Sequence, residues 1–300
     1  MPNCQHTDRS IVHLTEAEAA ALLPVRRGDA HKGTYGRLLI VAGSDCYTGA
    51  AALCTLAALR MGAGIVTLAS IPRVLAAAQA KLYEATFLPL PDNGAGQIAA
   101  QAAPLLLERA GAATALLVGC GLGLSPDGRI LTAELLRHAP CPVLLDADGL
   151  NAVAGRLWLL GEARQIPVLT PHVGEMSRLC GLSREEIKAD PARCAGEFAR
   201  QYRCVVALKD ADTVVAAPDG RLFLYEGRNA GMARGGSGDV LAGFAAALLA
   251  QGMEPAEAAA AAVRLHGAAG ERCARQRSRV AMLPHELPDM LGEVLRENGL

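Results

Sequence analysis

The sequence predicts an α/β fold built on a mostly parallel, doubly wound sheet with helices on both faces. Short apolar runs alternate along the chain with longer, alanine-rich stretches that have the length of helices. The short runs are continuously apolar, which is typical of parallel strands that are buried on both faces. Gly is frequent, at 32 residues, and aromatic residues make up only 3% of the chain. Small side chains and many glycines suit close packing and tight strand-to-helix turns.

The first half of the chain contains four predicted strands and one clear helix. Each strand is a short apolar run followed by turn residues, and the helix is an alanine-rich stretch that begins near Thr48. The expected strands are residues 37–42, 65–69, 115–118 and 143–146, and the expected helix is 48–61.

The second half continues this alternation of strands and helices and then contains consecutive strands. A strand at 168–170 ends before Pro171, and three consecutive strands follow, of which the last two are joined by the turn Pro218-Asp219-Gly220. The three strands are residues 204–208, 213–217 and 222–225, and the closing helices are 237–251, 255–275 and 284–296. The loosest stretch, residues 89–94, is too short to separate domains. We therefore expect one domain over residues 1–300.

Composition excludes several classes of protein. The formal net charge of -1 argues against a nucleic-acid or membrane-surface protein, which normally carries a basic face. The nine cysteines include no Cys-x-x-Cys pair and mostly lie in apolar stretches, which predicts buried thiols in a reducing compartment and no zinc site. Residues 1–10 lack the pattern of a secretory signal, and the longest apolar run, 241–250, is half the length of a membrane span. These features predict a cytoplasmic protein.

The sharpest motif is Gly235-Gly236-Ser237-Gly238-Asp239, placed directly before an apolar helix. Small residues let the backbone approach a ligand closely, and the free N–H groups of a helix start favour an anion. Asp239 alone reads equally well as a first-turn carboxylate that favours the helix dipole. A cap does not require three glycines, however. We therefore prefer Asp239 as a base that takes a proton from a substrate hydroxyl beside a bound phosphoryl group.

Further motifs follow the predicted strands in a fixed order. They are residues 31–36, 40–44, 47–51, 118–123, 146–151, 169–175, 208–213, 229–233 and 265–270. The string 235–239 resembles the anion hole and catalytic base of ribokinase-like enzymes. The ordered set, over about residues 31–291, resembles the ADP- or ATP-dependent NAD(P)H-hydrate dehydratases.

This resemblance implies a ribokinase-like three-layer sandwich and a repair reaction. In that reaction the C6 hydroxyl of a hydrated nicotinamide ring is phosphorylated from ADP or ATP, phosphate then leaves, and NADH or NADPH is restored. The resemblance also implies Mg²⁺ as a cofactor and a homotetramer, and shorter relatives of this kind favour ADP. It leaves open whether hydrated NADH or hydrated NADPH is preferred.

The resemblance carries roles over to individual positions. It implies Asp239 as the base and Gly236, Ser237 and Gly238 as the anion hole. It assigns the hydrated cofactor to Ala50, Gly121, His172 and Asp239, and the nucleotide to Lys209, Asp210, Ala211, Asp212, Thr213 and Gly238. It also implies a role for Glu175 near the phosphates, through metal and water.

Several of these positions have a simpler interpretation. His172 alone reads as a structural histidine, Glu175 as a first-turn helix carboxylate, and Arg234 as either a phosphate partner or a solvated side chain. Asp146 and Asp148 resemble a carboxylate pair that could bind a metal. We favour structural roles, in which Asp146 ends a strand, Asp148 caps the next helix and both line the pocket. Asp210 replaces a more usual glycine, which would cost stability if that position needs a positive φ. Cys120 stands where the family commonly has proline.

Two alternative functions stay open. A small-molecule kinase of the same superfamily would use the same base and anion hole on a sugar or vitamin-precursor alcohol. A nucleotide sensor would bind the nucleotide without turnover. Residues 1–30 form a short extension, below the size of a domain. We therefore expect this chain to lack the epimerase domain that related enzymes often carry.

Overall fold

A ten-stranded sheet runs through the protein in the order β1-β10-β9-β8-β7-β6-β5-β2-β3-β4. The computed structural model describes residues 11–300, so Cys4 and the segment 1–10 tested for a signal lie outside the described residues. The strands are β1 (Ile11–Val12), β2 (Arg37–Val41), β3 (Ile65–Ser70), β4 (Thr86–Pro89), β5 (Ala115–Val118), β6 (Val143–Leu145), β7 (Val168–Leu169), β8 (Val205–Leu208), β9 (Asp212–Ala216) and β10 (Leu222–Glu226).

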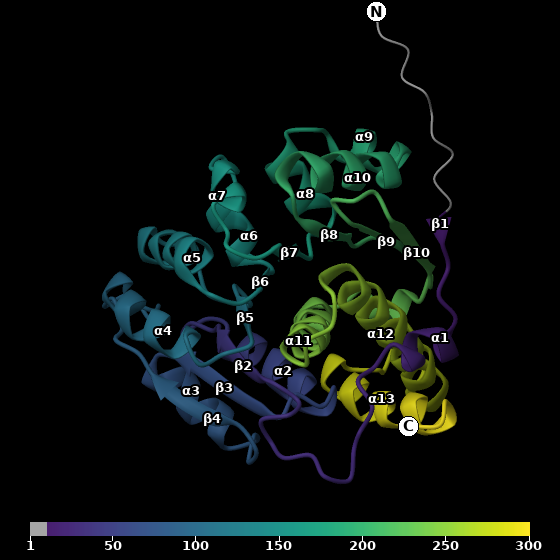
Figure 1. Ribbon diagram of the computed structural model, residues 1–300, viewed down its shortest axis with the longest axis horizontal. Coiled ribbons are helices and arrows are strands. Elements are labelled where there is room, and N and C mark those ends of the chain that lie inside the picture. Colours follow the sequence, from purple (N-terminus) through teal and green to yellow (C-terminus); the bar gives the residue numbers. More distant parts are fainter. Residues whose placement is uncertain (1–10) are drawn as a thin grey trace, which may run out of the picture.

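Helices cover both faces of the sheet and complete three layers (Figure 1). One layer holds α1 (Glu16–Ala21), α2 (Thr48–Arg60), α3 (Pro72–Gln79), α11 (Ser237–Ala250), α12 (Pro255–Arg277) and α13 (Leu287–Glu297). The other holds α4 (Ala103–Ala110), α5 (Pro126–His138), α6 (Asp148–Val153), α7 (Trp158–Gly161), α8 (Val173–Cys180), α9 (Arg184–Ala189) and α10 (Pro191–Tyr202). Short 3₁₀ turns lie at η1 (Ala100–Ala102), η2 (Ala230–Met232) and η3 (Pro284–Glu286).

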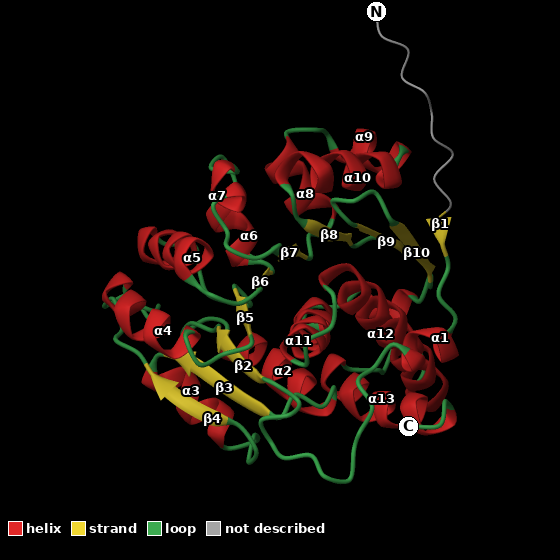
Figure 2. Ribbon diagram, viewed as in Figure 1, coloured by secondary structure: helices red, strands yellow, loops and turns green. Residues whose placement is uncertain are grey.

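The predicted α/β class and strand pairing are confirmed. Strands β2 to β8 pair in parallel, and β9 pairs antiparallel with β10, as the turn at 218–220 predicts (Figure 2). Strand β9 also pairs antiparallel with β8, which the sequence did not predict. The sequence prediction missed both edge strands, β1 and β4. These strands are short and partly exposed, so they lack the continuous apolar run that identified the buried strands.

Helix α11 lies at the centre of the molecule, and nearly all its residues are buried. It packs on the sheet, on α2 and on α12, so it is apolar on every side. Gly243 permits the close approach to α2, since a Cβ there would lie 2.3 Å from the carbonyl oxygen of Cys54. The first turn of α11 is thereby fixed at the carboxyl edge of the parallel strands, where ligands bind in open α/β sheets.

The eight described cysteines are all free thiols. Six are buried as expected, Cys180 is partly buried and Cys46 is exposed. Among residues 11–300, we find no helix with the length and apolar character needed to cross a membrane.

Candidate active site at the start of helix α11

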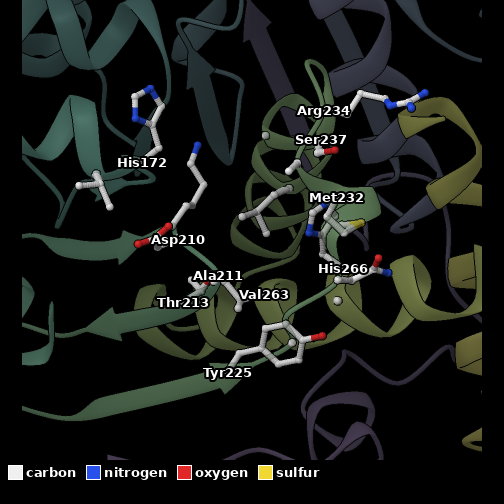
Figure 3. A pocket seen from close by; sticks show the side chains of 18 of the residues that line it. His172, Asp210, Ala211, Thr213, Tyr225, Met232, Arg234, Ser237, Val263 and His266 are labelled. Atoms are coloured by element: carbon white, nitrogen blue, oxygen red, sulfur yellow. The ribbon is translucent and has the colours of Figure 1, made fainter. Parts of the chain in front are cut away.

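Two cavities of similar size flank the first turn of α11. The first, of about 710 Å³, is lined by the segment Lys209–Ala211, by Thr213 and by side chains from η2 and α12, as Figure 3 shows. The second, of about 720 Å³, is lined by the loop after β2, the loop after β5 and residues 147–148. Both volumes are in the range of small-molecule sites. Ser237 and Gly238 line the first cavity, whereas Gly235, Gly236 and Asp239 line the second.

The backbone at the start of α11 requires glycine. Gly236 is the N-cap with a φ of 103°, and a Cβ there would lie 2.8 Å from Cδ1 of Leu53. The Ser237 amide already donates to the carbonyl of Arg234 at 3.2 Å. The first-turn amides of Gly238 and Asp239 have no acceptor within the helix, so they are available to an anion.

Asp239 is the carboxylate of this turn, and its pKa is raised to about 6. Burial is the largest cause, and the negative charge of Asp146 adds to it. A hydrogen bond from the Cys120 thiol and the charge of Lys209 act in the opposite direction. A carboxylate with this pKa is largely ionised at neutral pH and is more basic than an ordinary aspartate, as a general base requires.

Behind Asp239 lies a buried ion pair. Lys209 Nζ donates to Oδ1 of Asp146 at 2.8 Å, and Thr170 Oγ1 donates to the same oxygen at 2.6 Å. The Cys120 thiol lies 3.7 Å from Oδ2 of Asp146. Asp146 is only 2% exposed, and the charge of Asp146 helps to raise the pKa of Lys209 against the effect of burial.

The same cluster has the donor atoms of a cation site. One ligand atom each of Cys120, Asp146 and Asp239 lies within 4.8 Å of the others. The ammonium group of Lys209 already neutralises Asp146, however. The structure therefore fits the strand-end role that we favoured from the sequence better than direct metal ligation. The expectation that Asp146 also lines the pocket is wrong, because Asp146 is buried behind both cavities and lines neither.

His172 and Glu175 cap helix α8 together. Nδ1 of His172 accepts from the amides of Gly174 and Glu175 at 2.9 and 3.3 Å, and Glu175 Oε2 accepts from the His172 amide at 2.8 Å. Burial lowers the pKa of His172, helped by Lys209, and burial raises the pKa of Glu175. His172 lines the first cavity, not the second cavity that holds Ala50 and Gly121.

The loop from Lys209 to Thr213 brings four of its five residues to the first cavity. The exception is Asp212, which pairs with Arg228 at 3.1 Å. Asp210 has no positive φ, so its replacement of glycine carries no backbone strain. Its side chain instead pairs with Lys188 of α9 at 3.5 Å.

Ala50 and Gly121 meet in the second cavity. Gly121 has a φ of 63°, and a Cβ there would lie 2.5 Å from Cβ of Tyr47 and 2.9 Å from Cβ of Ala50. Ser44 donates to the Gly121 carbonyl at 2.8 Å, which ties the loops after β2 and β5 together. This wall of the cavity is therefore preformed.

Asp148 also lines the second cavity, but it does not cap α6 as expected. The N-cap is Ala147, which has a φ of 48° and no side-chain acceptor. Asp148 is the first helical residue, and its carboxylate accepts from the Gly123 amide at 2.8 Å.

Sequence reasoning missed several residues of the first cavity. Arg184 and Lys188 reach it from α9, and Tyr225, Asn229, Met232 and His266 complete its wall. His266 is in a motif noted in the sequence, but no local pattern gave it a role. Its pKa is lowered to about 4 by burial, so it is neutral. Arg234 lines the same cavity and donates to the carbonyl of Val280 at 2.8 Å.

Several known proteins are similar to this chain in sequence and in fold. The chain is 43% identical over 293 residues to the bifunctional NAD(P)H-hydrate repair enzyme Nnr of Moorella thermoacetica, in a match that covers 97% of this chain and 55% of that protein. It is 37% identical to the ADP-dependent (S)-NAD(P)H-hydrate dehydratase of Bacillus subtilis, over 93% of this chain and 96% of the relative. The chain spans about half the length of the bifunctional enzymes it matches.

A solved structure of one such relative is also similar to this chain in fold. The ADP/ATP-dependent NAD(P)H-hydrate dehydratase from Bacillus subtilis, co-crystallised with ATP/Mg²⁺, superposes with a TM-score of 0.82 at 34% identity. The match covers 95% of this chain and 97% of that structure. The predicted ribokinase-like fold is thereby confirmed. Residues 38–292 match the family model of the NAD(P)H-hydrate dehydratases, and the chain belongs to that family.

Proposed function

We propose that this chain restores hydrated NADH or NADPH to the intact cofactor in a nucleotide-dependent dehydration. One observation carries the proposal: within a single helical turn, Ser237 and Gly238 line one cavity and Asp239 lines the other. A phosphoryl donor in the first cavity and an acceptor hydroxyl in the second would meet at this turn. Family membership supports the same reaction.

In the proposed reaction, Asp239 takes the proton from the hydroxyl on C6 of the hydrated nicotinamide ring. The hydroxyl oxygen bonds to the terminal phosphorus of ADP or ATP, and the bond from that phosphorus to its bridging oxygen breaks. Phosphate then leaves C6 with the bonding electrons, and loss of a proton from the adjacent ring carbon restores the double bond. The amides at the start of α11 stabilise the charge of the phosphoryl group during transfer.

The proposed ligand contacts follow the two cavities. We assign the nucleotide to Lys209, Asp210, Ala211, Thr213 and Gly238, and the hydrated ring to Ala50, Gly121 and Asp239. Asp212 is paired with Arg228, so we propose that it supports the loop. The location of His172 beside Lys209 favours a contact with the nucleotide over the predicted contact with the hydrated ring.

Mg²⁺ is proposed to enter with the nucleotide, as in the relative co-crystallised with ATP/Mg²⁺. Oε2 of Glu175 accepts from the His172 amide, and Oε1 lies 3.5 Å from Nε2 of the same residue. Because both oxygens face His172, we propose that Glu175 acts on the ion through water, as the family resemblance implies, and not as a direct ligand. A cytoplasmic homotetramer is also proposed, on the family resemblance.

The decisive test is a spectroscopic assay with purified protein. Hydrated NADH or NADPH is mixed with ADP or ATP, and the absorbance of the restored dihydronicotinamide is followed. We expect recovery that requires the nucleotide and yields one phosphate per cofactor. Phosphorylation of a simple alcohol without recovery of NADH would instead identify a small-molecule kinase, and binding without turnover would identify a sensor.

A further inference from the structure

We propose that Asp146 is a positioning residue, which aims the Lys209 ammonium group at the phosphoryl group in transfer. The inference rests on the proposed nucleotide site in the first cavity. It starts from the position of Asp146 itself, which is 2% exposed and lines neither cavity. Ligands in the two cavities therefore do not contact Asp146, and any effect on the reaction must pass through its neighbours.

Lys209 is the neighbour that can transmit such an effect. Its Nζ is 2.8 Å from Oδ1 of Asp146, while its side chain lines the first cavity. The same Nζ lies 3.3 Å from the point that a Cβ on Gly238 would occupy. The ammonium group is thus held against the turn whose amides are free to bind an anion. It has three N–H donors, and only one is needed for Asp146.

The ends of three adjacent strands hold this arrangement. Asp146 follows β6, Thr170 follows β7 and Lys209 follows β8. Thr170 donates to Oδ1 of Asp146 at 2.6 Å, so the carboxylate that binds Lys209 is also held by the neighbouring strand end. Because these strands pair in parallel, their carboxyl ends present the network at one edge of the sheet.

Without Asp146, the Lys209 side chain would no longer be held in one orientation. A free lysine side chain has four rotatable bonds, and the carboxylates of Glu175 and Asp239 also interact with its charge. A shift toward Asp239 would neutralise the proposed base and withdraw the positive charge from the phosphoryl group. A cation fixed where charge develops stabilises a transition state without reorganisation. Asp146 provides that fixation for Lys209.

A binding experiment tests this role directly. Dissociation constants for ADP and AMP are measured by calorimetry on the wild type, Asp146→Asn, Lys209→Met and the double variant. The terminal phosphate that ADP adds is the group that Lys209 would contact. We expect the ratio of AMP to ADP dissociation constants to fall about 10-fold in each single variant, the size of a lost charge-assisted hydrogen bond. In the double variant, this ratio should fall no further than it does in the more strongly affected single variant.

Several outcomes would overturn the inference. If Asp146→Asn weakens ADP and AMP equally, Asp146 has only a structural role. If its effect persists in full on the Lys209→Met background, it acts independently of Lys209, for example as a cation ligand. If the wild-type chain does not bind ADP at all, the proposed function fails before this inference is reached.

A milder variant covers the case in which the single charge deletions do not fold. Thr170→Val keeps both charges and the side-chain volume but removes one hydrogen bond to Asp146. We expect it to lower kcat about 3- to 10-fold, with the KM for hydrated NADH unchanged. Unchanged kcat in this variant would contradict the proposal. Asp219→Asn, in the surface turn after β9, is the control for a carboxylate change without a role at this site.

Discussion

Ser237 and Asp239 lie two residues apart in the first turn of α11, yet they line different cavities. The turn therefore separates the two cavities. Its amides can reach a phosphate on one side, and its carboxylate can reach a hydroxyl on the other. This relationship leads to specific expectations for the base, the cavity walls and the cap of α8.

Asp239→Asn should separate binding from catalysis. The amide keeps the size of the side chain but does not accept a proton. We expect activity to fall about 10²- to 10⁴-fold, while the dissociation constant for ADP changes little. Coupled spectroscopic turnover and calorimetry measure the two effects, with Asp219→Asn as the control. Turnover near that of the wild type would exclude Asp239 as the base.

The pH dependence of kcat/KM should report the raised pKa of Asp239. The base must be ionised, so activity should fall toward acid with an apparent pKa of about 6 in the free enzyme. An aspartate with the ordinary pKa of 3.8 would lose activity only at much lower pH. A rate profile from about pH 4.5 to pH 8 in constant ionic strength, with enzyme stability checked at each pH, distinguishes the two. An acid limb that is absent above pH 5 would contradict the expectation.

The raised pKa of Asp239 should also make the stability of the protein depend on pH: activity should rise with pH, whereas stability should fall. Because the folded-state pKa of Asp239 is raised, the folded protein binds the proton more tightly than the unfolded chain does. The free energy of unfolding therefore decreases as the pH rises from 3.8 through about 6. Asp239→Asn avoids this cost and should be more stable at about pH 8, by roughly 1–3 kcal/mol. Urea unfolding at about pH 8 and pH 4.5 measures this, and an equal difference at both values would count against it.

Gly121→Ala should damage one cavity and spare the other. The new Cβ would lie 2.5 Å from Cβ of Tyr47, and φ is positive, so the loop after β5 must move. We expect the KM for the hydrated cofactor to rise at least about 10-fold with little change in ADP affinity. Gly155→Ala is the matched control, since it has a φ of 75° but open space around the added carbon. Equal effects of the two variants would assign the loss to backbone strain alone.

The cap formed by His172 can be tested with two variants of that residue. His172→Ala removes the acceptor for the Gly174 and Glu175 amides and should lower stability by about 1 kcal/mol. His172→Asn retains an acceptor at the N-cap and should recover most of that loss. If His172 also contacts the nucleotide, both variants should weaken ADP binding more than they raise the KM for the hydrated cofactor. The reverse order of effects would support the contact with the hydrated ring.

The sequence was informative where a local pattern has one physical meaning. The buried strands were predictable because a short, continuous apolar run indicates a strand that is covered on both faces. The start of α11 was predictable because clustered glycines before a helix indicate a backbone that a ligand can approach closely. The edge strands β1 and β4 were not, since an edge strand needs no continuous apolar run. The ion pair of Lys209 with Asp146 joins residues 63 positions apart. No local pattern contains it, because it depends on which strands become neighbours. The φ of Asp210 was likewise set by the fold and not by its side chain.

The contact between Gly243 and the backbone of Cys54 has a mechanical consequence. With no side chain at residue 243, α11 packs closely against the backbone of α2, and these two helices share an extensive contact. The first turn of α11, which separates the two cavities, is therefore held in place by the packing of this buried helix. Any adjustment to ligands in the two cavities is therefore expected in the surrounding loops and not in this helix pair.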